Sequence, residues 1–348
     1  MPVPRPRLRI AALAATSVLG CSPPAADAAR ALATWDQAVS VSRPFALQEN
    51  EDVVTVSPSV QFDGRGGFLV ADGPEGQVRR YGARGELLWK AGARGGGPGE
   101  FSNVQNVVRL RSGEVFAADF HGRFTVFDSV GRRVVRTIRS PLSFVEDVQS
   151  LSDSTILISG ILNGDNSSPR LHVWNVDRDR IVRSFFAPFR QARNPVAATI
   201  AGWTKASVRG DTIAAIFALS DSVYLFTTAG TPVRTLALPS PRFRRVGRDV
   251  PENGDDPRTR ARWLASFDYV ADVFWMHDGD LLVPYQSIVP DGAYTREWHL
   301  LRLGRSGEQK LEMRSVPRLL AVDSHSDRLY FVAPGAEAEN EWVLASLR

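Results

Sequence analysis

The sequence predicts an all-β fold, a six-bladed β-propeller of four-stranded blades, closed by an N-terminal strand that completes the last blade. A strand-turn-strand pattern at Gly66 to Glu86 recurs at Ser112 to Arg133 and, more faintly, four further times. Recurrence at this period indicates a repeat architecture, because one unit cannot bury its own apolar faces. From Trp35 onward there is no long helical period, apart from a short helix expected around Thr259 to Phe267.

Each copy places a glycine or polar turn before an apolar strand, the second of its blade. These second strands are Phe68–Ala71, Val115–Ala118, Ile156–Ile158, Ile213–Ile216, Leu281–Val283 and Leu329–Val332. First strands are predicted before five of them, at Val104–Leu110, Val145–Leu151, Trp203–Val208, Val270–Met276 and Pro317–Val322.

Each third strand ends on a large residue, and in most copies a glycine follows four positions later. The pairs are Tyr81 with Gly85, Phe127 with Gly131, Phe226 with Gly230 and Leu303 with Gly307, whereas Trp174 is followed by Arg178. Glycine at that position permits the positive φ of a tight hairpin, so a fourth strand is predicted after each turn.

The ring also needs a closing strand. The sixth unit ends at Trp342 to Leu347, its third strand, and an open ring would leave an unpaired sheet edge. We expect Gln37 to Gln48, which precede the first copy, to pair there as the missing strand.

The first twenty residues have the layout of an export signal. Arg5, Arg7 and Arg9 precede the apolar run Ile10 to Val18, which is too short to span a bilayer of roughly 30 Å as a helix. We therefore assign residues 1–20 to a lipoprotein signal peptide, 21–34 to a Pro/Ala-rich spacer and 35–348 to the propeller.

Cys21 is the only cysteine in the chain, and the run Val18-Leu19-Gly20-Cys21 resembles a bacterial lipobox. The resemblance implies that Cys21 becomes the first mature residue and carries lipid, which anchors the protein to a membrane. The alternative is an ordinary signal peptide with a coincidental cysteine. Because Ser22 follows rather than aspartate, the resemblance implies an exported lipoprotein at the outer membrane or on the periplasmic side.

The charge balance gives no reason to expect nucleic acid. The chain has 42 basic and 38 acidic residues, and removing the three leader arginines brings the net charge close to neutral. A near-neutral chain lacks the electrostatic basis for binding a polyanion. The mature protein is expected to be a monomer.

The segment Gly95 to Phe101, followed by Val115 to Asp119 and Val126 to Asp128, resembles the NHL-type repeat and its relatives among six-bladed propellers, including TolB-like proteins. The likeness covers Ser57 to Ser140 well and is weaker beyond. Val104 stands where that family usually has proline. The resemblance implies the fold and says little about activity, since propellers host many functions.

Loop lengths predict the binding face. Turns between first and second strands, and between third and fourth strands, are all short. The other connections open on the opposite face and contain every long insertion, at Ala91–Ser102, Leu162–Pro169, Pro188–Ala201, Pro239–Asp268 and Gln286–Glu297. Loops that tolerate insertion on a rigid scaffold commonly carry function, so this long-loop face is the expected binding face.

Five residues on the long-loop face are candidate ligand contacts. Asp72 and Asp119 end equivalent second strands, and His121 follows two residues after Asp119. They could instead form part of a metal site, or the aspartates could simply cap the turns that follow them. Arg94 and Glu100, which flank the glycine-rich stretch, complete the set.

No GxSxG, HExxH or GxxxxGK[ST] motif occurs, so neither a catalytic residue, a metal site nor a cofactor is predicted. The sequence favours a lipid-anchored, non-catalytic module of the cell envelope that binds a protein, peptide or glycan. The alternative is a metal-dependent lyase or hydrolase, with calcium or zinc held at the channel mouth by Asp72, Asp119 and His121. A purely structural lipoprotein is a third interpretation.

Overall fold

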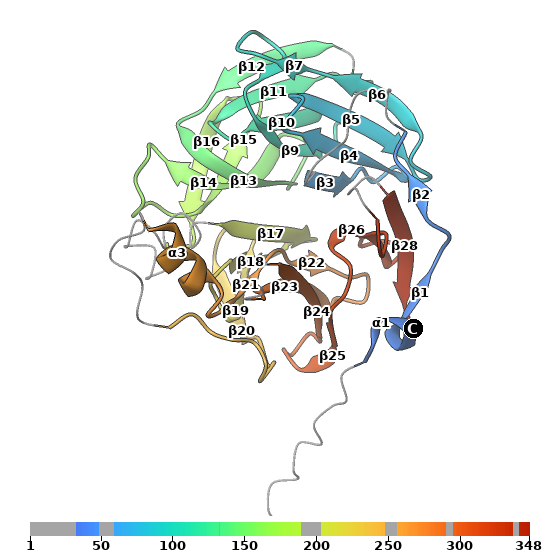
Figure 1. Cartoon of the computed structure of the whole chain (residues 1–348). Helices are drawn as coiled ribbons and strands as arrows, with labels where there is room; N and C mark the ends of the chain where they lie inside the picture. The colour runs from blue at the N-terminus through green and yellow to red at the C-terminus, as the bar shows by residue number, and fades with distance from the viewer. Residues whose placement is uncertain are drawn as a thin grey trace, which may run out of the picture. The chain divides into compact units, whose positions relative to one another are not determined.

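In the computed structural model, six antiparallel sheets of four strands are arranged in a ring, as the sequence predicts (Figure 1). The structure describes residues 33–48, 59–131, 133–188, 203–247, 256–289, 295–336 and 341–348. Within these residues no helix is both long and apolar enough to cross a bilayer. The leader, Cys21 and most of the spacer lie outside them, as does nearly all of the predicted insertion at 188–201.

The first five blades run from the channel outward in chain order. Blade one contains β3 (Ser59–Phe62), β4 (Gly67–Asp72), β5 (Gln77–Gly82) and β6 (Leu87–Ala91). Blade two contains β9 (Val104–Arg109), β10 (Val115–Asp119), β11 (Arg123–Phe127) and β12 (Val134–Arg139). Blade three contains β13 (Leu142–Ser150), β14 (Thr155–Leu162), β15 (Leu171–Asn175) and β16 (Arg180–Phe185).

Blade four contains β17 (Thr204–Arg209), β18 (Thr212–Phe217), β19 (Ser222–Thr227) and β20 (Pro232–Ala237). In blade five the inner strand is split into β21 (Asp268–Val270) and β22 (Phe274–Trp275), followed by β23 (Leu281–Ile288), β24 (Arg296–Leu303) and β25 (Gln309–Arg314). A parallel pair, β7 (Ala93–Arg94) with β8 (Glu100–Phe101), lies in the connection between blades one and two.

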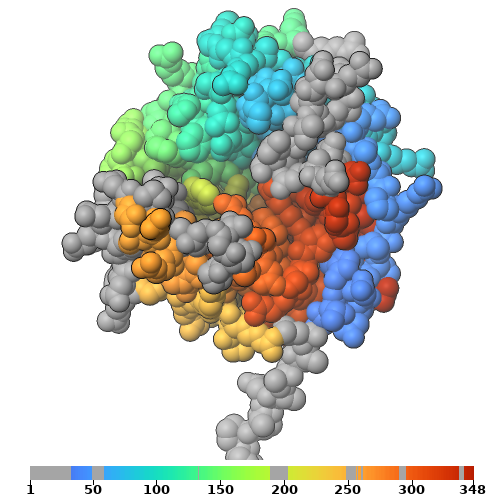
Figure 2. Space-filling view, viewed as in Figure 1, coloured from blue at the N-terminus to red at the C-terminus, as the bar shows by residue number. Residues whose placement is uncertain are grey.

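Blade six combines the two ends of the described chain. It contains β26 (Leu319–Asp323), β27 (Arg328–Val332) and β28 (Glu341–Leu347), and its outer edge is completed by β1 (Val39–Val41) and β2 (Phe45–Ala46). The predicted closing strand is therefore confirmed, although its first part forms the short helix α1 (Trp35–Ala38). Figure 2 shows this N-terminal segment, in blue, lying against the red C-terminal blade.

The core lies between neighbouring blades. Every residue of β4 and β10 is buried, because a strand with a sheet face packed on each side needs apolar residues at successive positions. The Phe68 ring of blade one lies edge-on to the rings of Tyr330 and Trp342 in blade six, with centroids 4.4 and 5.3 Å apart. Large aromatic residues thus join the first and last blades.

The predicted hairpin glycines adopt the required conformation. Gly85 and the three equivalent glycines have φ between 73° and 93°, and each hairpin has a register shift at the large residue before its turn. In blade three, where no glycine is available, Asp179 takes the positive φ (47°). The turn is held by the Arg178 N–H, which donates to the side chain of Asn175 at 2.8 Å.

Several predicted boundaries are wrong. The helix predicted at Thr259–Phe267 is α3, Pro257–Leu264, and β13 begins three residues earlier than expected. The stretch Gln286–Glu297, predicted as an insertion, is partly strand, since β23 extends to Ile288 and β24 begins at Arg296. Polar residues suggested a loop there, yet Gln286 and Ser287 are buried and paired in register with Trp298 and Glu297.

Candidate functional site

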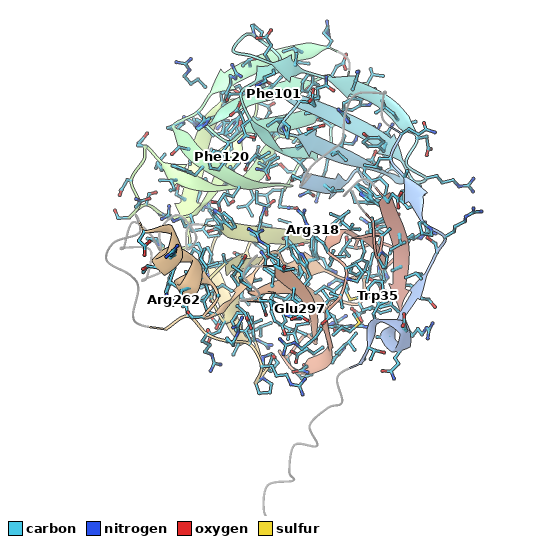
Figure 3. All side chains as sticks on the ribbon, viewed as in Figure 1. Trp35, Phe101, Phe120, Arg262, Glu297 and Arg318 are labelled. Atoms are coloured by element: carbon cyan, nitrogen blue, oxygen red, sulfur yellow. The ribbon has the colours of Figure 1, made fainter. Side chains whose placement is uncertain are left out.

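A cavity of about 1020 Å³ occupies the centre of the ring, where the inner strands of all six blades meet. Its wall includes Ser59, Gln105, Glu146, Asp147, Lys205, Asp272 and Leu319. Figure 3 places Arg318, another lining residue, close to the middle of the ring. Ligand pockets typically enclose roughly 300 to 1,000 Å³, so this channel is large enough to hold a ligand.

Glu146 and Asp147 reach the channel through a bulge in β13. The pairing of β13 with β14 shifts between Ser143 and Asp147, and Phe144 in the bulge has φ of 52°. A positive φ is uncommon for a bulky residue and marks a local irregularity. Gly160 lies opposite, and a Cβ on it would stand 3.2 Å from the Ser143 carbonyl oxygen.

The two carboxylates connect blade three to blade four. The Thr204 N–H donates to Glu146 Oε2 at 2.7 Å, and the Ala206 N–H donates to Asp147 Oδ2 at 2.7 Å. The inner edge of a blade carries backbone groups with no neighbouring strand, so these carboxylates satisfy two donors of β17. Lys205 donates from Nζ to the Glu146 carbonyl oxygen at 2.6 Å.

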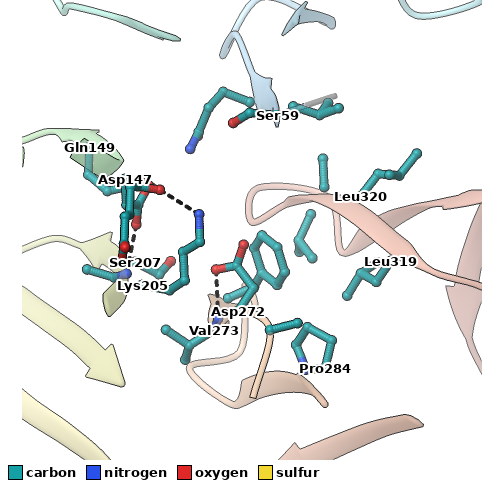
Figure 4. Close-up of a pocket in the computed structure, with 18 of the residues that line it drawn as sticks. Ser59, Asp147, Gln149, Lys205, Ser207, Asp272, Val273, Pro284, Leu319 and Leu320 are labelled. Carbon is teal, nitrogen blue, oxygen red and sulfur yellow. Dashed lines mark hydrogen bonds between the residues drawn. The ribbon is translucent and has the colours of Figure 1, made fainter. Parts of the chain in front are cut away.

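Asp272 reaches the channel because a proline interrupts blade five. Pro284 lies inside β23 and has no N–H to donate to the inner strand. The inner strand is broken beside it, between β21 and β22, and Asp272 occupies the break with one carboxylate oxygen accepting from the Val273 N–H at 2.8 Å. Figure 4 shows Asp147, Lys205 and Asp272 on one side of the cavity and Leu319 and Leu320 on the other.

Burial in the channel wall strongly alters the acidity of this cluster. Removal from bulk water raises the pKa of Glu146 to about 8 and that of Asp272 to about 7, and it also raises the pKa of Asp147. The nearby Lys205 ammonium lowers all three pKa values but does not offset burial. Some carboxyl groups of the cluster therefore carry a proton near neutral pH.

Aromatic side chains gather where the channel meets the long-loop face. Trp203, which immediately precedes β17, lines the channel and is 42% exposed. Phe120, after β10, also lines it and contacts the exposed ring of Phe144 edge-on, with centroids 5.1 Å apart. Trp298 lines the same cavity, with the Arg318 guanidinium 5.6 Å from its ring centroid.

Gln286 is a buried polar residue of the channel wall. It is only 4% exposed, and its Oε1 atom has no hydrogen-bond partner among the described residues. A buried acceptor without a partner costs about 1 to 3 kcal/mol, and this oxygen has almost no solvent-accessible surface, so it does not open onto the cavity.

The sequence-predicted residue Asp119 holds the connection between blades one and two. Its carboxylate accepts from the N–H groups of Ser102 (2.7 Å), Asn103 (3.2 Å) and His121 (3.1 Å), and from the Ser102 hydroxyl. Burial by itself would raise the pKa of Asp119, but these hydrogen bonds outweigh it and lower the pKa. Asp119 therefore makes the contacts that the turn-capping interpretation expects.

Asp72 has a similar environment. It lies 3.0 Å from the buried Arg79 guanidinium and accepts from the Glu75 N–H at 3.3 Å. Neither Asp72 nor Asp119 lines the channel, although Ala71, Gly73 and Phe120 beside them do. A direct ligand contact through either carboxylate stays a prediction.

The remaining predicted residues lie in or beside the glycine-rich connection. Arg94 is exposed, and Glu100 accepts from the Gly97 N–H at 2.7 Å. The His121 side chain is exposed, with its ring 5.4 Å from that of Phe120. In the described part of the chain no three His, Cys, Asp or Glu side chains are grouped so as to hold a metal ion.

Replacing Asp119 should show that its role is structural. We expect Asp119→Ala to lower the free energy of unfolding by about 1 to 3 kcal/mol, because the donors of Ser102 and Asn103 lose their acceptor. Urea unfolding measures this change. His121→Ala is the matched control and should change stability by no more than about 0.5 kcal/mol. Equal stability of the two variants would contradict the assignment.

A buried Ser–His–Asp arrangement occurs in blade five, but its geometry is not that of a nucleophile. The Ser287 hydroxyl donates to Asp268 at 2.8 Å and lies 2.8 Å from His299 Nε2. Since serine has one proton and gives it to aspartate, it accepts from histidine and is not activated by it. Asp268 also binds Arg244, and burial lowers the pKa of His299 to about 4.

The channel cluster is the feature that sequence reasoning missed. Glu146 and Lys205 belong to inner strands whose patterning does not show which side chains face the axis, and Asp272 lies in the break between β21 and β22. Two signals were available: Pro284 inside an apolar second strand predicts a break in its neighbour, and Lys205 is one of three lysines in the chain. Gln286 was missed because it was placed at the start of a predicted insertion.

No family model matches this chain, and no curated protein matches it. Solved structures with the same fold do. One is a member of the DUF4221 family from Bacteroides vulgatus, 11% identical, covering 89% of this chain and 98% of its own length with a TM-score of 0.64. Another is a candidate exported protein from Bacteroides fragilis, 13% identical, covering 91% and 96% of the two chains with a TM-score of 0.62. At these identities the likeness shows the fold, and the NHL and TolB-like resemblance stays a prediction.

Proposed function

We propose that this protein is an exported, lipid-anchored and non-catalytic binding module, which takes a ligand into its central channel from the long-loop face. The ligand is an envelope protein, a peptide or a glycan. Export is supported by the leader and by the shared fold with a candidate exported protein. Anchoring rests on the lipobox-like run that ends at Cys21.

The observation that carries the proposal is the polar cluster facing the cavity. Glu146, Asp147, Lys205 and Asp272 come from three different blades and line one open volume. Holding ionisable groups away from bulk water is costly. Strongly perturbed carboxyl groups in a cavity are more common at functional sites than elsewhere.

The non-catalytic part of the proposal rests on how the reactive groups are used. Asp147 and Glu146 already accept backbone N–H bonds from β17, and Ser287 is not activated by His299. Because these hydrogen bonds fix the orientation of the two carboxyl groups, Asp147 and Glu146 are suited to holding a ligand in place.

A substitution that fills the channel tests this function. Ser59 lines the cavity at the start of β3, so Ser59→Trp should obstruct the channel without disturbing the blade core. Val233→Trp, at a 58% exposed position of the outer strand β20, is the matched control. The purified proteins are incubated with envelope extract, washed and denatured, and the released compounds are identified by mass spectrometry.

We expect a compound to be released in stoichiometric amount from the wild-type protein and from Val233→Trp, but not from Ser59→Trp. Thermal unfolding should confirm that all three are folded. Recovery of the same compounds from all three proteins, or of none from any, would overturn the channel as the binding site.

A further inference from the structure

We propose that the ligand of the channel is a neutral saccharide, whose ring stacks on Trp203 and whose hydroxyl groups bond with the Asp147–Lys205–Asp272 cluster. This inference rests on the proposed function and assigns a ligand class to the same site. It follows from the charge, the polar groups and the aromatic surfaces of the cavity wall.

The wall carries acidic and basic side chains in equal number. Three acidic residues line the cavity, Glu146, Asp147 and Asp272, and so do three basic ones, Lys205, Arg296 and Arg318. A site selective for a polyanion or a polycation would carry a clear excess of the opposite charge. By residue count the channel has no such excess, and protonation of part of the carboxyl cluster leaves only a small positive charge, so the wall is not built to select a polycation or a polyanion.

The hydrogen-bonding groups match hydroxyl chemistry. Lys205 has three N–H bonds, of which the Glu146 carbonyl takes one. Protonated and ionised carboxyl groups of the cluster supply a donor and acceptors in one place. A sugar hydroxyl both donates and accepts, so it can satisfy each of these groups in turn.

The aromatic residues supply the second half of a saccharide site. Trp203 presents an exposed indole at the channel, and Phe120 and Trp298 line the same volume. Amphipathic aromatic rings provide rigid contact area of low conformational entropy. The apolar face of a pyranose can stack on such a ring while its hydroxyl edge points toward the polar wall.

An extended peptide fits less well. It would bind by adding a strand to an inner blade edge, but on β17 the Thr204 and Ala206 N–H groups are already bonded to Glu146 and Asp147. Those bonds leave that edge short of donors for a peptide backbone. A saccharide does not require them.

Titration of the purified protein with uncharged trisaccharides tests the ligand class. Cellotriose, chitotriose, maltotriose and xylotriose are compared with trialanine, spermidine and trigalacturonate, by calorimetry and by tryptophan fluorescence. We expect at least one neutral trisaccharide to bind. Trp203→Ala should weaken that binding tenfold or more, whereas Leu88→Ala, at an exposed position of the outer strand β6, should leave it unchanged.

The outcomes distinguish the two proposals. If none of the neutral trisaccharides binds, and trialanine or spermidine binds in a manner that Trp203→Ala weakens, the saccharide assignment fails and the channel remains a binding site. If no compound of any class binds, and none is recovered from envelope extract, both proposals fail.

Discussion

A chain that begins at residue 49 should lose its cooperative unfolding transition, whereas a chain that begins at residue 33 should unfold like the full-length protein. The difference between the two is the closing segment 33–48. That segment supplies β1 and β2, which pair with β28 over five residue pairs, from Val39 with Leu347 to Ala46 with Glu341.

The closing segment also buries apolar surface against three blades. Val39 and Leu47 are each 3% exposed, the Trp35 ring lies edge-on to Phe331 at 4.7 Å, and Ala33 bridges to Met313. Burying one large apolar side chain contributes about 1.5 to 3 kcal/mol. Losing several at once removes an amount comparable with the roughly 5 to 15 kcal/mol that stabilises a whole domain.

Circular dichroism during urea unfolding shows whether the chain that begins at residue 49 has lost its cooperative transition. A synthetic peptide of residues 33–48, added in trans, should restore part of the transition, because the edge of β28 remains available to it. A peptide with the same composition in scrambled order is the control. Identical unfolding curves for the chains beginning at 33 and 49 would contradict the role of the closing segment.

Stability should fall as the pH rises from 6.5 to 8.5. Glu146 and Asp272 have folded-state pKa values of about 8 and 7, above their ordinary values of 4.5 and 3.8. Over this range the folded state holds protons that the unfolded state has released, so raising the pH favours unfolding. One such carboxyl contributes up to about 1.4 kcal/mol per pH unit, so we expect a total loss on the order of 3 kcal/mol.

The pH window isolates the carboxyl groups. Burial lowers the pKa of His172 and His299 from 6.5 to about 4. The contribution of these two neutral histidines to the free energy of unfolding is present above pH 6.5, and it is lost as the pH falls from 6.5 toward 4. Asp63 and Asp119, whose pKa values are lowered, lose their contribution only below about pH 4.

Asp272→Asn is the variant that tests the source of the slope. Asparagine keeps an oxygen for the Val273 N–H but cannot ionise, so the fall in stability between pH 6.5 and 8.5 should shrink by about a third, and stability at pH 8.5 should rise. Asp153→Asn, at an exposed position in the β13–β14 turn, should leave the slope unchanged. Urea unfolding at each pH gives both values, and a wild-type slope in Asp272→Asn would refute the assignment.

The sequence predicts the scaffold well because its signals are local. The glycine four positions after Tyr81 or Phe127 can adopt the positive φ that a tight hairpin needs. Apolar runs such as Phe68–Ala71 are recognisable as strands without knowing which strands pair with them. The closing strand was predictable because an unpaired third strand, Trp342 to Leu347, requires a partner. These inferences need only short segments and the requirement that sheet edges be paired.

The site was less predictable because it depends on irregularities. Asp72 and Asp119 recur with the repeat, and the structure gives both of them turn-capping contacts. Glu146 and Asp272 reach the channel through a bulge and a broken strand, each set by a residue on the adjacent strand. Repetition therefore identified the positions that maintain the blades, whereas the channel chemistry lies where the repetition fails.

Closure by an N-terminal segment also imposes an order of events on synthesis. β1 emerges from the ribosome early, yet its partner β28 comes about three hundred residues later. Until then the ring is open, and both the waiting strand and the free flank of the first blade are templates for unwanted pairing. We therefore expect the chain to be most prone to aggregation before β28 is available, because only then can the two ends pair and close the ring.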